Sequence, residues 1–122
     1  MTSRIAVIAI DALDRDKVAA FWTAVLGWSV LEQDAEVTSI GPADKGWPCI
    51  DIVSVPERKT VKNRLHLDLR ADGSTAGEEV ARLLALGATR ADVGQGDDVT
   101  WTVLADPEGN EFCVLSRSVQ EV

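Results

Sequence analysis

The residues of this chain best suited to chemistry are one histidine and a neighbouring carboxylate inside a strand-like segment. His66 is the single histidine, so it is the first candidate for a general base near neutral pH. Asp68 follows at a spacing that places both side chains on one face of a strand, where it could orient the imidazole. Their Cβ atoms would lie ~7 Å apart, so the spacing leaves contact open. Ordinary hydrogen bonding on a polar strand face explains His66 equally well.

Three further side chains are candidates for contact with a ligand. Asp51 interrupts the apolar segment Cys49–Val53, so its charge faces either solvent or a binding site. Cys113 is a small core residue in the ordinary interpretation and a reactive thiol in the alternative one. Trp101 lies in a strand-like segment, where it could form a flat wall for a planar ligand or simply pack.

The first half of the chain predicts a strand, a helix and three more strands. Arg4–Ile10 is an apolar, β-branched strand candidate, and Asp11–Asp14 supplies helix-capping residues after it. An apolar stripe at helical spacing follows and ends at Gly27; its members are Val18, Phe21, Trp22, Val25 and Leu26. Three short strand candidates come next: Trp28–Leu31, Val37–Ile40 and Cys49–Val53.

The second half repeats this order. Arg64–Arg70 alternates, with Leu65, Leu67 and Leu69 predicted on the buried face and His66 and Asp68 on the other. Thr75 and Glu78 fit a capping box that begins a helix ending at Gly87. Three strand candidates follow, with a type I turn over Asp106–Gly109 before the last: Ala88–Ala91, Val99–Ala105 and Glu111–Leu115.

This repeat predicts the fold class. Two βαβββ modules, rather than alternating strands and helices, indicate an α+β fold with mostly antiparallel sheet. A length of 122 residues suits one domain with one continuous core. We expect a single domain over 1–122, with module one at 1–55, a polar crossover at 56–63 and module two at 64–122.

Composition excludes several classes of protein. The chain has no apolar run long enough to cross a bilayer and no separate signal region at its start. A formal charge of −8 repels nucleic acid and anionic lipid. The two cysteines are far apart, without metal-finger or redox spacing, which indicates reduced thiols. We therefore expect a cytoplasmic protein that binds neither nucleic acid nor membrane.

Three segments carry a resemblance to a known superfamily: Asp14–Trp28, Val55–Leu69 and Trp101–Leu115. They resemble parts of the vicinal oxygen chelate superfamily, whose members include glyoxalases, bleomycin-resistance proteins and extradiol dioxygenases. The resemblance implies a curved sheet around a small-molecule cleft and assembly as a homodimer. It also implies a divalent metal, often held by one side chain from each of four strands, which would polarise vicinal oxygens.

The four metal-ligand positions implied by this resemblance are poorly filled. They fall on Val7, on Val53 with Asp51 two residues earlier on the same face, on His66 and on Cys113. One ordinary ligand, one thiol and one displaced carboxylate are short of a catalytic set. We therefore predict a protein that binds a small organic molecule without a cofactor or metal, whether or not it is an enzyme. The predicted ligand-binding residues are Asp51, Val53, His66, Asp68, Trp101 and Cys113.

Two alternatives stay open. One is a metal-dependent lyase, isomerase or dioxygenase with the atypical ligand set His66, Cys113 and Asp51. The other is a protein without a ligand that acts through its dimer surface.

Overall fold

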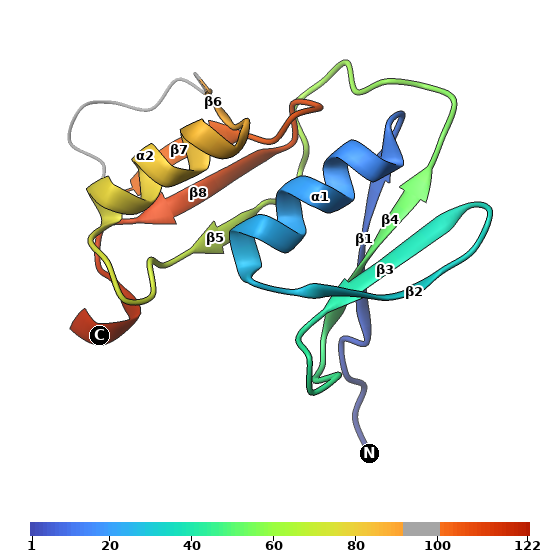
Figure 1. Cartoon of the computed structure of the whole chain (residues 1–122), viewed down its shortest axis with the longest axis horizontal. Coiled ribbons are helices and arrows are strands. Elements are labelled where there is room, and N and C mark those ends of the chain that lie inside the picture. Colours follow the sequence, from blue (N-terminus) through green and yellow to red (C-terminus); the bar gives the residue numbers. More distant parts are fainter. Residues whose placement is uncertain (92–100) are drawn as a thin grey trace. The chain divides into compact units, whose positions relative to one another are not determined.

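The computed structural model describes residues 1–91 and 101–122 of the chain (Figure 1). They form two compact units, and from here on module one means Met1–Arg58 and module two means Lys59–Val122, so the predicted crossover 56–63 is divided between them. The described residues of each module make a four-stranded mixed sheet and one α-helix. No described helix has the length and apolar character needed to span a membrane.

Module one contains a sheet with strand order β1-β4-β3-β2. Strand β1 is parallel to β4, whereas the β4–β3 and β3–β2 pairs are antiparallel. The element bounds are β1 (Val7–Ala12), α1 (Arg15–Leu26), β2 (Ser29–Gln33), β3 (Val37–Gly41) and β4 (Cys49–Ser54).

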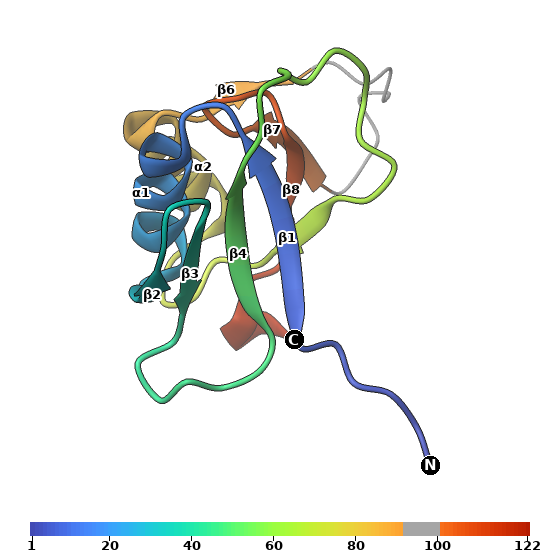
Figure 2. The same ribbon diagram turned by 90° about the vertical axis from the view of Figure 1, so that its right-hand side faces the viewer.

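Helix α1 lies along one face of this sheet and packs on β3 and β4 (Figure 2). It begins at the predicted cap, where the Asp14 carboxylate accepts a hydrogen bond from the Lys17 N–H at 3.2 Å. It ends at Gly27, whose φ of 65° is the left-handed conformation that glycine tolerates best. The predicted stripe is buried except for Leu26, which is half-buried, and Trp22 is only 1% exposed. Burial of this stripe against the sheet holds module one together.

A threonine in the core of module one gives a first stability prediction. Thr38 on β3 is 2% exposed, and its Oγ1 is the buried side-chain oxygen without a hydrogen-bond partner among the described residues. An unpaired buried hydroxyl costs about 1–3 kcal/mol. We expect Thr38→Val, which keeps the shape and removes the hydroxyl, to raise the unfolding free energy by about 1 kcal/mol.

Urea denaturation followed by circular dichroism measures this change. Thr89→Val is the control, because Thr89 is exposed on a strand and its hydroxyl is open to water. A stabilisation of the same size in both variants would trace the gain to β-propensity rather than to the buried hydroxyl.

Module two has the equivalent strand order, β5-β8-β7-β6. Strand β5 is parallel to β8, and the other two pairs are antiparallel (Figure 1). The element bounds are β5 (Leu67–Leu69), α2 (Ala76–Leu86), β6 (Thr89–Arg90), β7 (Trp101–Ala105) and β8 (Glu111–Leu115). Helix α2 carries the predicted capping box of Thr75 and Glu78, and it packs against β8.

The predicted fold class is confirmed, since both modules have βαβββ order and each sheet is mixed. The prediction for Arg64–Arg70 was wrong at its beginning. Strand β5 starts at Leu67, and Leu65 is 89% exposed rather than buried. The reason is that the ladder between β5 and β8 begins at Leu67, so the preceding residues lie outside it. Val99 and Thr100 of another predicted strand lie outside the described residues.

Two smaller differences concern the first strand and the end of the chain. The first strand runs from Val7 to Ala12 and not from Arg4 to Ile10, because its ladder partner β4 spans Cys49 to Ser54. A 3-10 helix at Val119–Glu121 was not predicted. Its Val119 N–H donates to the Ala71 carbonyl at 2.8 Å, which ties this segment to the loop before α2.

Candidate functional site

The two faces of the module-two sheet differ in character. Leu104, Phe112 and Val114 are at most 1% exposed and share one face, which with Leu83 of α2 forms the core. Side chains alternate along a strand, so Val103 and Cys113 point to the opposite face, together with Asp68. The predicted site residues of module two lie on this second face.

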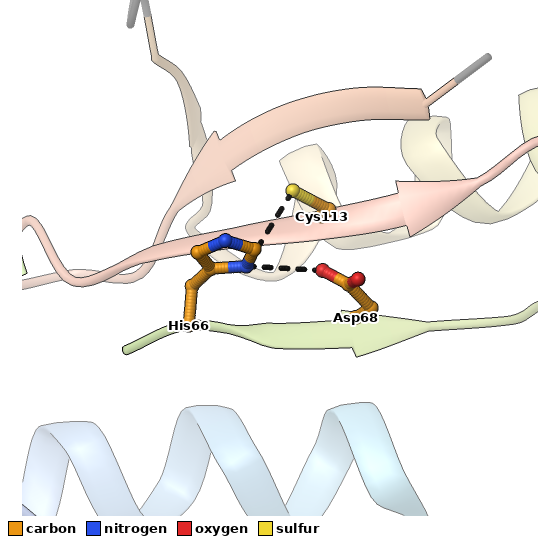
Figure 3. Close-up of side chains that lie close together, drawn as sticks. All are labelled: His66, Asp68 and Cys113. Carbon is orange, nitrogen blue, oxygen red and sulfur yellow. Dashed lines mark hydrogen bonds and ion pairs between the residues drawn. The ribbon is translucent and has the colours of Figure 1, made fainter. Parts of the chain in front are cut away.

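His66, Asp68 and Cys113 converge there (Figure 3). Asp68 rises from β5, Cys113 comes from the neighbouring β8, and His66 immediately precedes β5. The His66 Nδ1 lies 3.0 Å from the Asp68 Oδ1 and 4.0 Å from the Cys113 Sγ. The register explains the meeting, because Asp68 pairs with Cys113 across the parallel ladder. The contact between His66 and Asp68, which their spacing left open, is therefore present in the structure.

This contact fixes which imidazole nitrogen is available. An ionised carboxylate only accepts hydrogen bonds, so the Nδ1 next to Asp68 carries the proton of the neutral ring. The Nε2 then has an open lone pair, and it makes no hydrogen bond to a residue within 1–91 or 101–122. His66 can accept a hydrogen bond from a ligand at this atom.

The thiol beside this pair is held in its neutral form. The pKa of Cys113 is raised to about 11, first by burial and then by the negative charge of Asp68 and a hydrogen bond to it. The Lys62 ammonium opposes this effect more weakly. Cys113 is 6% exposed, so at neutral pH it contributes a small, uncharged lining group.

The thiol gives a second prediction, made in a Cys49→Ser background so that Cys113 is the single cysteine. Iodoacetamide should label Cys113 at a rate that still rises about tenfold per pH unit from pH 7 to 9, because the thiolate is the reactive form. Asp68→Asn removes the adjacent negative charge and so lowers the pKa of Cys113. It should therefore speed labelling about three- to tenfold at pH 8. Mass spectrometry measures both rates. A rate that levels off near pH 8.5 would contradict a raised pKa.

Trp101 is on the same face at the far end of the strands. It pairs with Leu115, while Val103, two residues further along β7, pairs with Cys113. Its side chain is 40% exposed, so part of the indole is available for contact. The flat indole of Trp101 thus lies on β7 two residues from Val103, the residue that pairs with Cys113.

The remaining predicted residues, Asp51 and Val53, belong to β4 of module one. Both face away from α1, since the alternate residues Ile50 and Ile52 are buried in the core. The Ser39 hydroxyl donates to the Asp51 carboxylate at 2.6 Å. Asp51 is therefore satisfied within its own sheet, and its part in a ligand site, like that of Val53, stays a prediction.

A group of polar residues next to the cluster was missed by sequence reasoning. The Glu111 carboxylate accepts hydrogen bonds from the Lys59 ammonium at 2.8 Å and from the Asn63 N–H at 3.1 Å. Burial acts to raise the pKa of Glu111, but these hydrogen bonds outweigh it and the pKa is lowered. The available signal in the sequence was the charge of Glu111 between the Asp106–Gly109 turn and the apolar part of the last strand. A charged residue at the end of a strand is also typical of an ordinary edge position.

The cluster also has donors suited to a divalent metal, although two of them are engaged with each other. One ligand atom from each of His66, Asp68 and Cys113 lies within 4.8 Å of the others. Imidazole, carboxylate and thiolate are ordinary zinc ligands. The thiol would first have to lose its proton, which its raised pKa disfavours. The donor types fit such an ion, and these three residues would hold it.

Solved structures of low sequence identity share this fold. One is a glyoxalase/bleomycin resistance protein/dioxygenase family enzyme from Burkholderia phytofirmans PsJN, with TM-score 0.68, 22% identity and coverage of 92% of this chain and 97% of that one. Another is the fosfomycin resistance protein FosX from Listeria monocytogenes complexed with Mn(II) and sulfate, with TM-score 0.73, 16% identity and coverage of 99% and 98%. A third is the bleomycin resistance determinant of transposon Tn5, with TM-score 0.60, 17% identity and coverage of 96% and 100%.

The comparison with protein families agrees with these structures. No curated protein matches the chain. The family described as glyoxalase-like domain matches residues 7–115, which include both βαβββ modules from β1 to β8. The chain therefore belongs to the glyoxalase-like domain family.

Proposed function

We propose that this protein binds a small organic molecule on the face of the module-two sheet that carries His66, Asp68, Trp101 and Cys113. The observation that supports the proposal most is the contact between His66 and Asp68, which leaves the imidazole Nε2 open. A polar acceptor of fixed orientation beside a neutral thiol and an exposed indole is a typical arrangement for ligand recognition.

The dimensions of the face suggest the chemistry of the ligand. Trp101 of β7 pairs with Leu115, two residues along β8 from Cys113, whereas Asp68 and His66 lie on the other side of β8. A ligand that contacts both would therefore extend across β8, with a planar apolar body on the indole and a hydroxyl or amide donor at the imidazole. This binding needs no metal, because the imidazole, the indole and the thiol make the contacts themselves.

A thermal-shift screen of small aromatic compounds and antibiotics tests the proposal. For a compound that stabilises the protein, we expect His66→Ala and Trp101→Ala each to weaken binding about three- to tenfold in calorimetry, the loss of one hydrogen bond or one ring contact. Trp47→Ala is the control, because Trp47 is 61% exposed in module one. Equal binding by the wild type and by His66→Ala would defeat the proposal.

The second candidate function is metal-dependent chemistry, which the closeness of His66, Asp68 and Cys113 favours. A bound ion would polarise an oxygen of the substrate. Elemental analysis of protein purified without chelators separates the two candidates. A stoichiometric divalent ion that is lost in His66→Ala would establish the second, whereas ligand binding by protein free of metal would establish the first.

The expected homodimer and cytoplasmic location are part of the same proposal. Cys49 and Cys113 are both free thiols in the structure, which suits a reducing compartment. Sedimentation velocity at micromolar concentration tests the dimer, and a single species with the mass of one chain would contradict it.

A further inference from the structure

His66 lies outside strand β5 and needs support from other contacts. It precedes β5, which begins at Leu67, so His66 is not part of the ladder that holds Leu67, Asp68 and Leu69 beside β8. The residues before it, from Val55 to Leu65, form neither helix nor strand. The position of its backbone must therefore depend on contacts made by this crossover segment.

Those contacts gather on Glu111 and Asn110 at the beginning of β8. Glu111 accepts from the Asn63 N–H at 3.1 Å and from the Lys59 ammonium at 2.8 Å. The Asn63 amide donates to the Asn110 Oδ1 at 2.8 Å. Asn63 is three residues before His66, so these contacts hold the segment directly ahead of the imidazole.

The register places this anchor next to the site. Leu67 pairs with Phe112 in the parallel ladder, so one step back brings His66 level with Glu111. Glu111 also shares a strand face with Cys113, two residues further along β8. The anchor and the cluster therefore occupy the same face of the sheet.

The burial of this ion pair argues for a positional role. The side chains of Glu111 and Lys59 are 12% and 19% exposed. Removing both charges from water offsets much of their attraction, so such a pair adds little stability. The contribution of the pair is to fix a position, because the carboxylate accepts hydrogen bonds from two donors of the crossover and so holds that segment in one place.

From these contacts we infer that Glu111, with Asn63, is a positioning residue that sets His66 over Cys113 and against Asp68. This inference rests on the proposed role of His66. It is tested in protein without ligand, so its failure is distinguishable from failure of the ligand screen.

The single histidine makes the test direct, since a long-range proton–nitrogen spectrum contains the signals of one imidazole. With the ring neutral at alkaline pH, the wild type should show the Nδ1–H tautomer that the contact with Asp68 selects. In Glu111→Ala we expect the shifts of both ring nitrogens to move towards the averaged values of exchanging tautomers. Glu111→Gln keeps an acceptor for Asn63 and should recover most of the wild-type signature.

Glu79→Ala is a matched control. Glu79 also has a side chain that is 12% exposed, and it also forms an ion pair, with Arg82 at 2.7 Å. We expect this variant to leave the His66 signals unchanged. A wild-type signature in Glu111→Ala, or the same change in Glu79→Ala, would overturn the inference. If Glu111→Ala does not fold, Asn63→Ala removes the amide contact with Asn110 and should move the signals in the same direction.

Discussion

Replacing Trp22 with alanine is expected to lower the unfolding free energy of module one by about 3–5 kcal/mol, the range for truncating a large buried aromatic side chain. Trp22 is 1% exposed and lies in the centre of the α1 stripe. Its ring meets that of Phe21 edge to face, with centroids 5.2 Å apart and an interplanar angle of 89°. Alanine would leave a cavity between α1 and the sheet. Urea denaturation followed by far-ultraviolet circular dichroism measures the loss.

The chain offers a control of the same residue type. Trp47 is 61% exposed, and its described ring contact is with the Arg4 guanidinium, 4.8 Å from the ring centroid. Trp47→Ala should cost at most about 1 kcal/mol, the strength of an exposed cation–π contact. Trp22→Phe refills part of the cavity and should fall between the two. Similar losses for Trp22→Ala and Trp47→Ala would show that α1 is not anchored by its stripe.

The helices were predictable because their signals are local. The apolar stripe ending at Leu26, the cap at Asp14 and the glycine stop at Gly27 all lie within one short segment. The capping box of α2 is equally local, since Thr75 and Glu78 are three residues apart. Propensity, pattern and capping agree at each of these positions, so the sequence indicates one structure there.

The β5 prediction was one residue too long at its end, where the strand stops at Leu69, and three residues too long at its beginning, for a different reason. Alternation from Leu65 to Leu69 suggests one continuous buried face, but a strand also needs a partner. The ladder with β8 begins at Leu67, and the Asn63 backbone is bound by the Glu111 carboxylate instead. A contact between residues 48 apart in sequence leaves no periodic signal.

The candidate site, too, could be predicted from the sequence only in part. His66 and Asp68 could be placed on one face from their spacing, and Cys113 could be placed on a neighbouring strand. The 3.0 Å contact between His66 and Asp68 depends on rotamers that spacing does not specify. Glu111 was missed because its partners Lys59 and Asn63 come from a crossover without periodicity. Such anchors need the register between β5 and β8, which only the folded structure supplies.

Replacing Asp106 with alanine is expected to have the largest effect on module two, a loss of about 2–4 kcal/mol in unfolding free energy. Asp106 is 2% exposed at the first position of the β7–β8 turn. Its carboxylate accepts the N–H groups of Glu108 and Asn110 and the side-chain amide of Asn110, each at 2.9 Å. Alanine removes these three hydrogen bonds at a part-buried turn, and it releases Asn110, which in turn holds Asn63.

Urea denaturation and the nitrogen spectrum of His66 together check this prediction. Asp44→Ala is the control, because Asp44 is exposed and its carboxylate accepts from the Gly46 N–H at 2.8 Å in a comparable turn of module one. We expect Asp44→Ala to lose much less stability and to leave the His66 signals unchanged. Since Asn110 connects the turn to the crossover, Asp106→Ala should also disturb the His66 tautomer, as Glu111→Ala does. If Asp106→Ala is destabilised but its His66 signals are unchanged, the turn does not help to position His66. Glu111 would then position it without the contact through Asn110.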